Sequence, residues 1–459
     1  MALSAVIILA AGKSRRMKTG KSKVLHALLG KPMIFYGLEL AEKLEPAKTI
    51  VVIGPNSKDI RDSLTQKKIS FAVQKKPLGT ADAVAAALPL LRGLKGDALI
   101  YYADNPLFSL STMKALVRLR QRDKAPLALL SAEFSENPPA FGRILRDKQG
   151  KVLAIIEEAD CTEEQKKIKE LNAGAYCLSI DFLKKALQEI KPDNRQKEYY
   201  LTDLVKIAAK KRLPVVASVT HDWKEALGIN SRAELSKAAA ILKDRINQSW
   251  MAKGVTIEDP ERTLIESEVK VGQDTIIESE ARLLGKTRIG KNCWVQAGAR
   301  IVDSVIEDNV EVRQGSVIEQ SKVGSGTSIG PMAHLRPESV VGKNVRIGNF
   351  VELKKTVIND RSMAAHLTYL GDAVIGKAVN IGCGVITCNY DGFRKNQTVI
   401  EDNAFIGSDT QLVAPVRVGK GAYIGSGSTI TEDVPPGSLA IARATQVIKE
   451  KWLQNRKKK

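Results

Sequence analysis

Long apolar runs are missing from this sequence. No stretch approaches the about 20 apolar residues that a helix needs to cross a bilayer. The strongest run, residues 5–11, is short and lacks the flanks of a secretory signal. We therefore expect neither a membrane helix nor a signal peptide, and we interpret residues 5–11 as a buried strand.

Cysteine and histidine are scarce. The five cysteines are scattered, odd in number and without a C-x-x-C pair. This pattern argues against a disulfide framework and against structural zinc, and it favours a reducing, cytoplasmic compartment. Only four histidines are present, so a catalytic histidine must come from a short list.

Aromatic residues make up only 5% of the chain and do not alternate with lysines, as a base-stacking platform would require. The formal net charge of +20 raises nucleic acid as a partner. However, the positive residues are spread along the chain, and only 456–459 is a dense run. We interpret the charge as a basic surface that attracts phosphorylated substrates, and we do not expect nucleic-acid binding.

The first half alternates β-rich and helical stretches. Strands are expected at 5–11, 49–53 and 98–102, and helices at 80–91 and 109–122. This alternation predicts a mostly parallel sheet covered on both faces. Because ligands of such sheets bind beyond the carboxyl ends of the strands, chemistry is expected in the loops after Ala11 and Tyr102.

A connecting helix is expected at residues 231–253. Ser231 and Glu234 have the spacing of a capping box, and apolar residues follow at helical intervals until Gly254. We therefore expect one domain at 1–230, a linker helix at 231–253 and a second domain at 254–459.

The second half repeats an aliphatic residue followed by glycine, mostly at intervals of six or twelve residues, as in Ile289-Gly290, Val341-Gly342 and Ile406-Gly407. A six-residue period predicts a parallel β-helix, in which the aliphatic residue points inward and the chain then turns a corner. A sandwich would show a period of two without a fixed glycine. The repeat breaks around 359–372, which contains His366, and around 388–398. Loops that interrupt a solenoid commonly carry function.

No standard nucleotide-binding motif follows the first strand. The segment Gly12-Lys13-Ser14 lacks the earlier glycine of a P-loop, and no G-x-G-x-x-G is present. What remains is a turn with one glycine and several basic residues, whose N–H groups and positive charge suit a triphosphate.

The motifs that follow are more specific in their order. They are Gln74, Gly79-Thr80, Tyr102-Ala103-Asp104, Phe141-Gly142-Arg143, Glu157, Asn172 and Gly228-Ile229-Asn230. This order resembles the nucleotide-sugar pyrophosphorylases. With the six-residue repeat added, the chain from about residue 5 to about residue 452 resembles the bifunctional N-acetylglucosamine-1-phosphate uridyltransferases/glucosamine-1-phosphate acetyltransferases. The resemblance implies an α/β Rossmann-like nucleotidyltransferase domain followed by a left-handed parallel β-helix.

For the first half, the resemblance implies transfer of uridylate from UTP to N-acetylglucosamine 1-phosphate. Arg16 and Lys23 would stabilise the charge on the triphosphate, and Asp104 and Asn230 would ligate Mg²⁺ through oxygen atoms. The implied contacts to UTP or UDP-N-acetylglucosamine are Leu9, Ala10, Ala11, Gly12, Lys23, Gln74, Gly79, Thr80, Tyr102, Asp104, Gly142, Glu157, Asn172 and Asn230.

Four positions of this half depart from the family pattern. Ser14 and Arg15 replace a glycine and a threonine, Ser22 stands where a proline is usual, and Ala159 stands where a lysine is usual. They leave open an alternative hypothesis: an acetyltransferase whose first half is weakened or uses another nucleotide.

For the second half, acetylation of an amine with acetyl-CoA requires a base, and histidine titrates near neutral pH. His366 begins a His-Leu-Thr-Tyr run that matches the acetyltransferases, so we predict that it is the base, and that His26, His221 and His334 are structural. The resemblance implies sugar-phosphate contacts at Arg336, Lys354, Tyr369 and Asn380, and acetyl-CoA contacts at Cys383, Asn389, Tyr390, Ser408, Ser426 and Arg443. It also implies a homotrimer, with acyl-CoA bound between neighbouring prisms.

Overall fold

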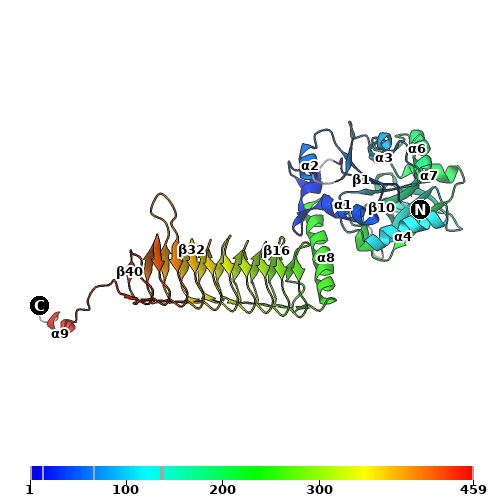
Figure 1. Ribbon diagram of the computed structural model, residues 1–459. Helices are drawn as coiled ribbons and strands as arrows, with labels where there is room; N and C mark the ends of the chain where they lie inside the picture. The colour runs from blue at the N-terminus through cyan, green and yellow to red at the C-terminus, as the bar shows by residue number, and fades with distance from the viewer. Residues whose placement is uncertain (1–2, 13–14, 66–67, 135–138, 457–459) are drawn as a thin grey trace. The chain divides into compact units, whose positions relative to one another are not determined.

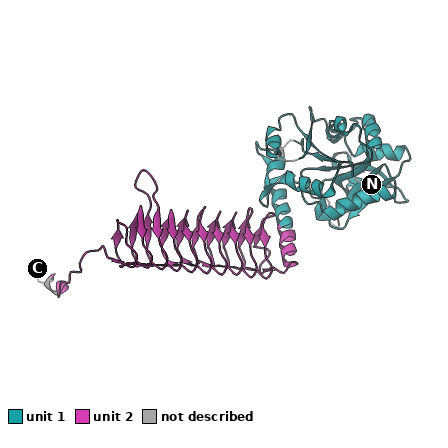
Figure 2. Cartoon of the chain, viewed as in Figure 1, with its two compact units in different colours: residues 1–242 teal, residues 243–459 magenta. Residues whose placement is uncertain are grey.

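The computed structural model describes residues 3–12, 15–65, 68–134 and 139–456. Ser14 and the residues 457–459 of the basic tail lie outside this part. The chain forms two compact units, Met1–Leu242 and Lys243–Lys459 (Figure 2). No helix in the described ranges is long and apolar enough to cross a membrane.

The first unit is built on a nine-stranded sheet whose main path runs β11-β7-β10-β6-β1-β4-β5. β10 is antiparallel to β6 and β7, whereas the other neighbours on this path are parallel. The strands are β1 (Ala5–Leu9), β4 (Lys48–Ile53), β5 (Ser70–Val73), β6 (Asp97–Tyr102), β7 (Leu127–Glu133), β10 (Glu170–Ser179) and β11 (Val215–Thr220). The expected mostly parallel sheet is confirmed, and the first strand ends two residues earlier than predicted.

Helices cover both faces of this sheet because its strands are apolar on both sides. Val6 and Ile8 of β1 pack in one core with α1 (Met33–Leu44) and α4 (Leu110–Arg122). Ala5 and Ile7 pack in a second core with the helices α3 (Thr80–Ala85), α6 (Ile180–Ala186) and α7 (Asp203–Lys210). The helix predicted at 80–91 ends at Ala85, and a separate 3₁₀ turn containing Pro89 follows, since proline lacks the N–H that a helix interior needs.

The predicted connecting helix is α8 (Arg232–Met251). Its capping box is formed, because Ser231 Oγ accepts from the Glu234 amide at 3.2 Å and Glu234 Oε2 accepts from the Ser231 amide at 2.8 Å. Its first half packs in the first unit through Ala238 and Leu242. Its last turns pack on the core of the second unit through Ile246 and Trp250.

The second unit is a parallel β-helix made of three sheets, with one strand of each sheet per coil (Figure 1). The first sheet runs from β12 (Thr256–Ile257) to β41 (Leu439–Ala440), the second from β13 (Leu264–Ile265) to β40 (Thr429–Ile430), and the third from β14 (Lys270–Val271) to β38 (Val416–Val418). The aliphatic residues of the repeat form one continuous buried core. The predicted left-handed β-helix is confirmed.

One of the two expected interruptions is wrong. Residues 359–372 continue the coil, since β30 (Met363–His366) pairs with β27 (Arg346–Asn349) on one side and β33 (Asn380–Ile381) on the other. Ala364 takes the inward position in register with Ile347 and Ile381. An alanine therefore replaced the aliphatic signal without changing the fold, and His366 lies on the coil itself.

The other interruption is confirmed. Between β34 (Ile386–Cys388) and β35 (Thr398–Ile400) the chain leaves the stack as a projecting loop (Figure 1). A β-bridge between Tyr390 and Lys395 closes its base. We refer to residues 389–397 as the projecting loop.

The stacked core gives a stability prediction. Leu353 is fully buried between Leu335 and Leu370 of the adjacent coils. We expect Leu353→Ala to lower the free energy of unfolding by about 2–5 kcal/mol in urea titrations followed by circular dichroism. The exposed Lys322→Ala should change it by less than about 0.5 kcal/mol. Equal stability of the two variants would contradict the inward stacking.

Candidate active sites

The first candidate site lies at the carboxyl ends of β1 and β6. These strands are parallel, with Leu9 in register with Tyr102. The amide of Ala103 donates to Leu9 O at 3.0 Å, and the amide of Ala10 donates to Val52 O at 2.8 Å. The loops predicted to carry the chemistry are therefore held side by side.

Two of the cavities at this edge share Tyr102 and Asp104. The first has a volume of about 400 Å³, and the predicted residues that line it are Leu9, Ala10, Ala11, Gly12, Lys23, Gln74, Gly79 and Thr80. The second has a volume of about 540 Å³, and the predicted residues that line it are Arg16, Gly142, Glu157, Asn172 and Asn230. Residues far apart in the sequence thus meet in one cleft of the first unit.

The wall of the first cavity depends on Gly79. Its φ of +126° is unfavourable for other residues, and a Cβ there would lie 2.4 Å from Tyr199 O. Gln74 is positioned beside it, because its Nε2 donates to Gly79 O at 3.0 Å and to Asp82 Oδ2 at 2.8 Å. Glu198 also lines this cavity and was not anticipated from the sequence.

Asp104, Lys23 and Asn230 form a polar centre between the two cavities. The Lys23 ammonium forms an ion pair with Asp104 Oδ2 and donates to Asn230 Oδ1 at 2.8 Å. The two acceptors are brought together by the main chain, since the amide of Ile229 donates to Asp104 O at 2.9 Å. The Asn230 amide is in turn held by Glu234 Oε2 at 2.7 Å, so the cap of α8 also positions Asn230.

Glu157 and Asn172 face the second cavity across Gly142. A Cβ on Gly142 would lie 2.8 Å from Ile155 Cγ2 and 3.5 Å from Glu157 Oε2, so a side chain there would enter the space between them. Burial raises the pKa of Glu157, and the nearby acidic side chains raise it further. A hydrogen bond that Thr202 Oγ1 donates to Glu157 Oε1 at 2.9 Å acts in the opposite direction and lowers the pKa.

The second candidate site lies along the edge of the β-helix between its first and second sheets. At this edge, main-chain hydrogen bonds join the equivalent corners of successive coils. The Leu367 amide donates to Asn349 O at 3.0 Å, and the Gly384 amide donates to Leu367 O at 3.1 Å. On the next coils, the Asp409 amide donates to Cys383 O at 2.7 Å and the Gly427 amide donates to Ser408 O at 2.8 Å. Finally, Arg443 Nη1 donates to Ser426 O at 2.7 Å. The edge therefore carries His366 and, beyond it, four of the predicted acetyl-CoA contacts: Cys383, Ser408, Ser426 and Arg443.

His366 is exposed at this edge, and its Nδ1 lies 3.1 Å from Asn349 Oδ1. An amide oxygen only accepts hydrogen bonds. The contact therefore fixes the proton on Nδ1 and leaves the lone pair on Nε2, which is the tautomer that a base requires. Asn349 was not anticipated, because nothing in the sequence pairs it with His366.

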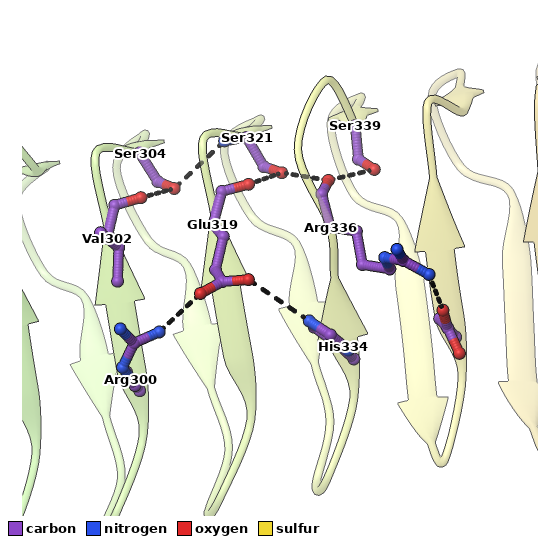
Figure 3. Close-up of polar contacts among 9 residues, drawn as sticks. Arg300, Val302, Ser304, Glu319, Ser321, His334, Arg336 and Ser339 are labelled. Atoms are coloured by element: carbon purple, nitrogen blue, oxygen red, sulfur yellow. Dashed lines mark hydrogen bonds and ion pairs between the residues drawn. The ribbon is translucent and has the colours of Figure 1, made fainter.

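The second sheet carries, or directly adjoins, three of the four predicted sugar-phosphate residues: Arg336, Lys354 and Tyr369. Arg336 Nη1 donates to Glu352 Oε1 at 2.9 Å (Figure 3). Beside this pair, Glu319 Oε1 lies 2.6 Å from Arg300 Nη1, and Glu319 Oε2 lies 3.6 Å from His334 Nε2. Glu352 is in register with Tyr369 on the next coil. His334 thus has a carboxylate neighbour, Glu319. Asn380 lies on the neighbouring first sheet, in register with Met363 and Phe405.

The projecting loop adds a cation that the sequence reasoning missed. Lys395 contacts Lys354, which lowers the pKa of Lys395 below its usual value. Asn389, buried at the base of the loop, donates from Nδ2 to Asp372 Oδ2 at 2.5 Å and to the Tyr369 hydroxyl at 3.5 Å. Two ammonium groups held close together favour an anion between them. The location of Lys395 in the interruption of the repeat was the available signal.

Known proteins match both units. Residues 6–171 match the model of the MobA-like NTP transferase domain, residues 260–358 that of the GMPPB C-terminal domain, and residues 397–432 that of the bacterial transferase hexapeptide (six repeats). The "Bifunctional protein GlmU" of Pelobacter propionicus is 46% identical over 456 residues, which covers 99% of each chain. The protein of that name from Thermodesulfovibrio yellowstonii is 47% identical, again over 99% of each chain, and that from Shouchella clausii is 43% identical over 98% of each.

The chain belongs to the GlmU family. This confirms the resemblance inferred from the motifs, together with the prediction of a bifunctional enzyme that combines a nucleotidyltransferase with a hexapeptide-repeat acyltransferase. Nucleotide-sugar chemistry follows from the same membership.

Proposed function

We propose that this GlmU-family chain carries out two consecutive reactions. The β-helix unit transfers the acetyl group of acetyl-CoA to glucosamine 1-phosphate, and the α/β unit then transfers uridylate from UTP to N-acetylglucosamine 1-phosphate. The product would be UDP-N-acetylglucosamine, a precursor for peptidoglycan and lipopolysaccharide. The observation that carries the proposal is the gathering of every residue assigned to uridyl transfer around two adjoining cavities, in a chain whose relatives match it over nearly its full length.

In uridyl transfer, a phosphate oxygen of the sugar attacks the α-phosphorus of UTP and pyrophosphate leaves. The first cavity would hold the nucleotide, and the second would hold the sugar against Glu157 and Asn172. Arg16, which lines the second cavity, would supply positive charge for the phosphates. Both substrates would meet at Asp104, which lines both cavities.

Asp104 and Asn230 suit Mg²⁺, because their oxygens already converge on one cation, the Lys23 ammonium. The described residues contain no group of three or more His, Cys, Asp or Glu side chains that could hold a metal. The ion would therefore take two protein ligands and complete its shell with phosphate oxygens and water, which is usual for Mg²⁺ in phosphoryl-transfer sites. When bound, it neutralises charge on the reacting phosphates.

In acetyl transfer, the sugar amine attacks the thioester carbonyl of acetyl-CoA and the C–S bond breaks. His366 Nε2 would take the proton that the amine loses, and the Asn349 contact would hold the imidazole in the required tautomer. Arg336, Lys354, Tyr369 and Asn380 would bind the sugar phosphate. Cys383, Asn389, Tyr390, Ser408, Ser426 and Arg443 would bind acetyl-CoA. The released thiolate leaves as CoA once it is protonated.

Two assays on the purified protein test this function. Release of CoA thiol from acetyl-CoA is measured with glucosamine 1-phosphate, and release of pyrophosphate from UTP is measured with N-acetylglucosamine 1-phosphate and Mg²⁺. Both products are expected. CoA release without pyrophosphate would favour the alternative that Ser14, Arg15, Ser22 and Ala159 motivate, and replacing UTP by the other nucleoside triphosphates would then identify the nucleotide used.

Lys395 is expected to contribute to sugar-phosphate binding. Loss of one charge-assisted hydrogen bond to a phosphate should raise the KM for glucosamine 1-phosphate about 10-fold or more in Lys395→Ala, with a small effect on kcat. Arg394→Ala is the matched control, since Arg394 is the adjacent cation of the projecting loop and is exposed. Equal KM values for the two variants would exclude Lys395 from the site.

We also propose that the chain is a cytoplasmic homotrimer. The outer face of the third sheet supports self-association, because Val340, Val357, Val374 and Val399 stack in register along it as an apolar stripe. Light scattering should give three times the mass of one chain, and Val374→Glu should lower it; a monomeric wild type would contradict the proposal. The five cysteines are free, which suits a reducing compartment.

A further inference from the structure

Lys23, to which the family resemblance assigns a role at the triphosphate, has an ammonium that is largely shielded from solvent. The residue is buried, and its side chain is 11% exposed. The ammonium lies against the Asp104 carboxylate and the Asn230 amide oxygen. These are the two oxygens to which the proposed function assigns Mg²⁺.

A partly buried carboxylate is stabilised by a compensating charge. Asp104 is 20% exposed in its side chain, so the loss of its partner would leave a poorly solvated anion. An ammonium and a divalent ion cannot both occupy the space between the same two oxygens. The ammonium and the divalent ion would also repel each other more strongly here than two cations in water would, since the surroundings are partly desolvated.

We propose that Lys23 is a built-in counter-ion that Mg²⁺ displaces. Without metal, its ammonium keeps the two ligand oxygens together and compensates the charge of Asp104. When the metal binds, the ammonium moves off these oxygens and remains in the first cavity, where it can pair with a nucleotide phosphate. The proposal rests on the magnesium assignment above. Metal binding would free the ammonium for the nucleotide, and because coupling between two binding sites is reciprocal, nucleotide binding would favour metal binding to the same extent.

The first test measures metal affinity without nucleotide or turnover. Mn²⁺, a spin-active substitute for Mg²⁺, is titrated into the full-length protein and followed by electron paramagnetic resonance. Lys23→Met removes the competing charge while keeping an unbranched side chain, so we expect Mn²⁺ to bind about 10-fold more tightly or better than in the wild type. Unchanged or weaker binding in this variant would overturn the proposal.

Two controls accompany this titration. Lys31 has the same 11% side-chain exposure and pairs with a carboxylate, Glu39, but lines neither cavity of the cleft, so Lys31→Met should leave Mn²⁺ affinity unchanged. Asp104→Asn should abolish Mn²⁺ binding. If it does not, the magnesium assignment itself fails, which is a different outcome from unchanged affinity in Lys23→Met.

The second test uses the wild-type protein and does not depend on the folding of a variant. Lysine acylation by a water-soluble reagent is quantified by mass spectrometry with and without Mg²⁺, in the absence of nucleotide. Labelling of Lys23 should rise several-fold when Mg²⁺ is added, while labelling of Lys31 stays constant. If the metal leaves Lys23 labelling unchanged or lowers it, the ammonium is not displaced and the proposal is wrong.

Discussion

His366→Ala is expected to lower acetyl transfer about 10²- to 10⁴-fold, the usual contribution of a positioned general base, and to leave uridyl transfer unchanged. The imidazole is exposed on the prism edge, and its only described hydrogen bond is to Asn349, so its removal should cost little stability. The measurement is the release of CoA thiol, with pyrophosphate release from the same preparation as the internal control.

Two further variants separate catalysis from folding. Asn349→Leu removes the acceptor that selects the tautomer, so it should lower kcat less than His366→Ala does and shift the pH profile of acetyl transfer. His334→Ala removes another histidine of the β-helix, a partly exposed one whose neighbour is Glu319, and should leave both rates unchanged. A His366→Ala protein that is folded but has lost both activities would contradict two independent sites.

The β-helix could be predicted from the sequence because every coil repeats the same physical requirement. Each inward position stacks on the equivalent side chain of the next coil, as Leu335, Leu353 and Leu370 do, and this selects aliphatic residues at a fixed period. The capping box of α8 was predictable for a similar reason, since Ser231 and Glu234 interact over three residues of chain. Both signals are local in sequence.

The same reasoning failed where the signal was not local. Ala364 occupies an inward position, but its side chain is too small to be recognised as part of the aliphatic pattern. The sequence of this continuous coil therefore resembled that of a loop. Asn349 and Lys395 reach the second candidate site only through the stacking of coils and the projection of one loop. The role of Lys23 was implied by the family resemblance, but its contact with Asn230 could not be predicted, because it joins residues far apart in the sequence.

Asp104→Asn is the second large expected effect. The substitution keeps the size of the side chain but removes the charge that attracts a divalent cation. We expect uridyl transfer to fall at least about 10²-fold, the scale measured for the loss of one electrostatic contact to the reacting group. Acetyl transfer should stay at its wild-type rate, which also reports that the protein is folded. Asp123→Asn, at a surface carboxylate paired with Arg122, is the matched control and should change neither rate.

Mixing the two defective proteins gives the sharpest test of two separate sites. The Asp104→Asn protein should convert glucosamine 1-phosphate to N-acetylglucosamine 1-phosphate, and the His366→Ala protein should accept that product and release pyrophosphate. Neither variant alone should form UDP-N-acetylglucosamine from glucosamine 1-phosphate, acetyl-CoA and UTP, whereas the mixture should form it. The intermediate must leave one molecule and enter another. The rate of UDP-N-acetylglucosamine formation should therefore rise with the concentration of the His366→Ala protein until acetylation becomes limiting. A mixture as inactive as its components would mean that the two units do not act independently.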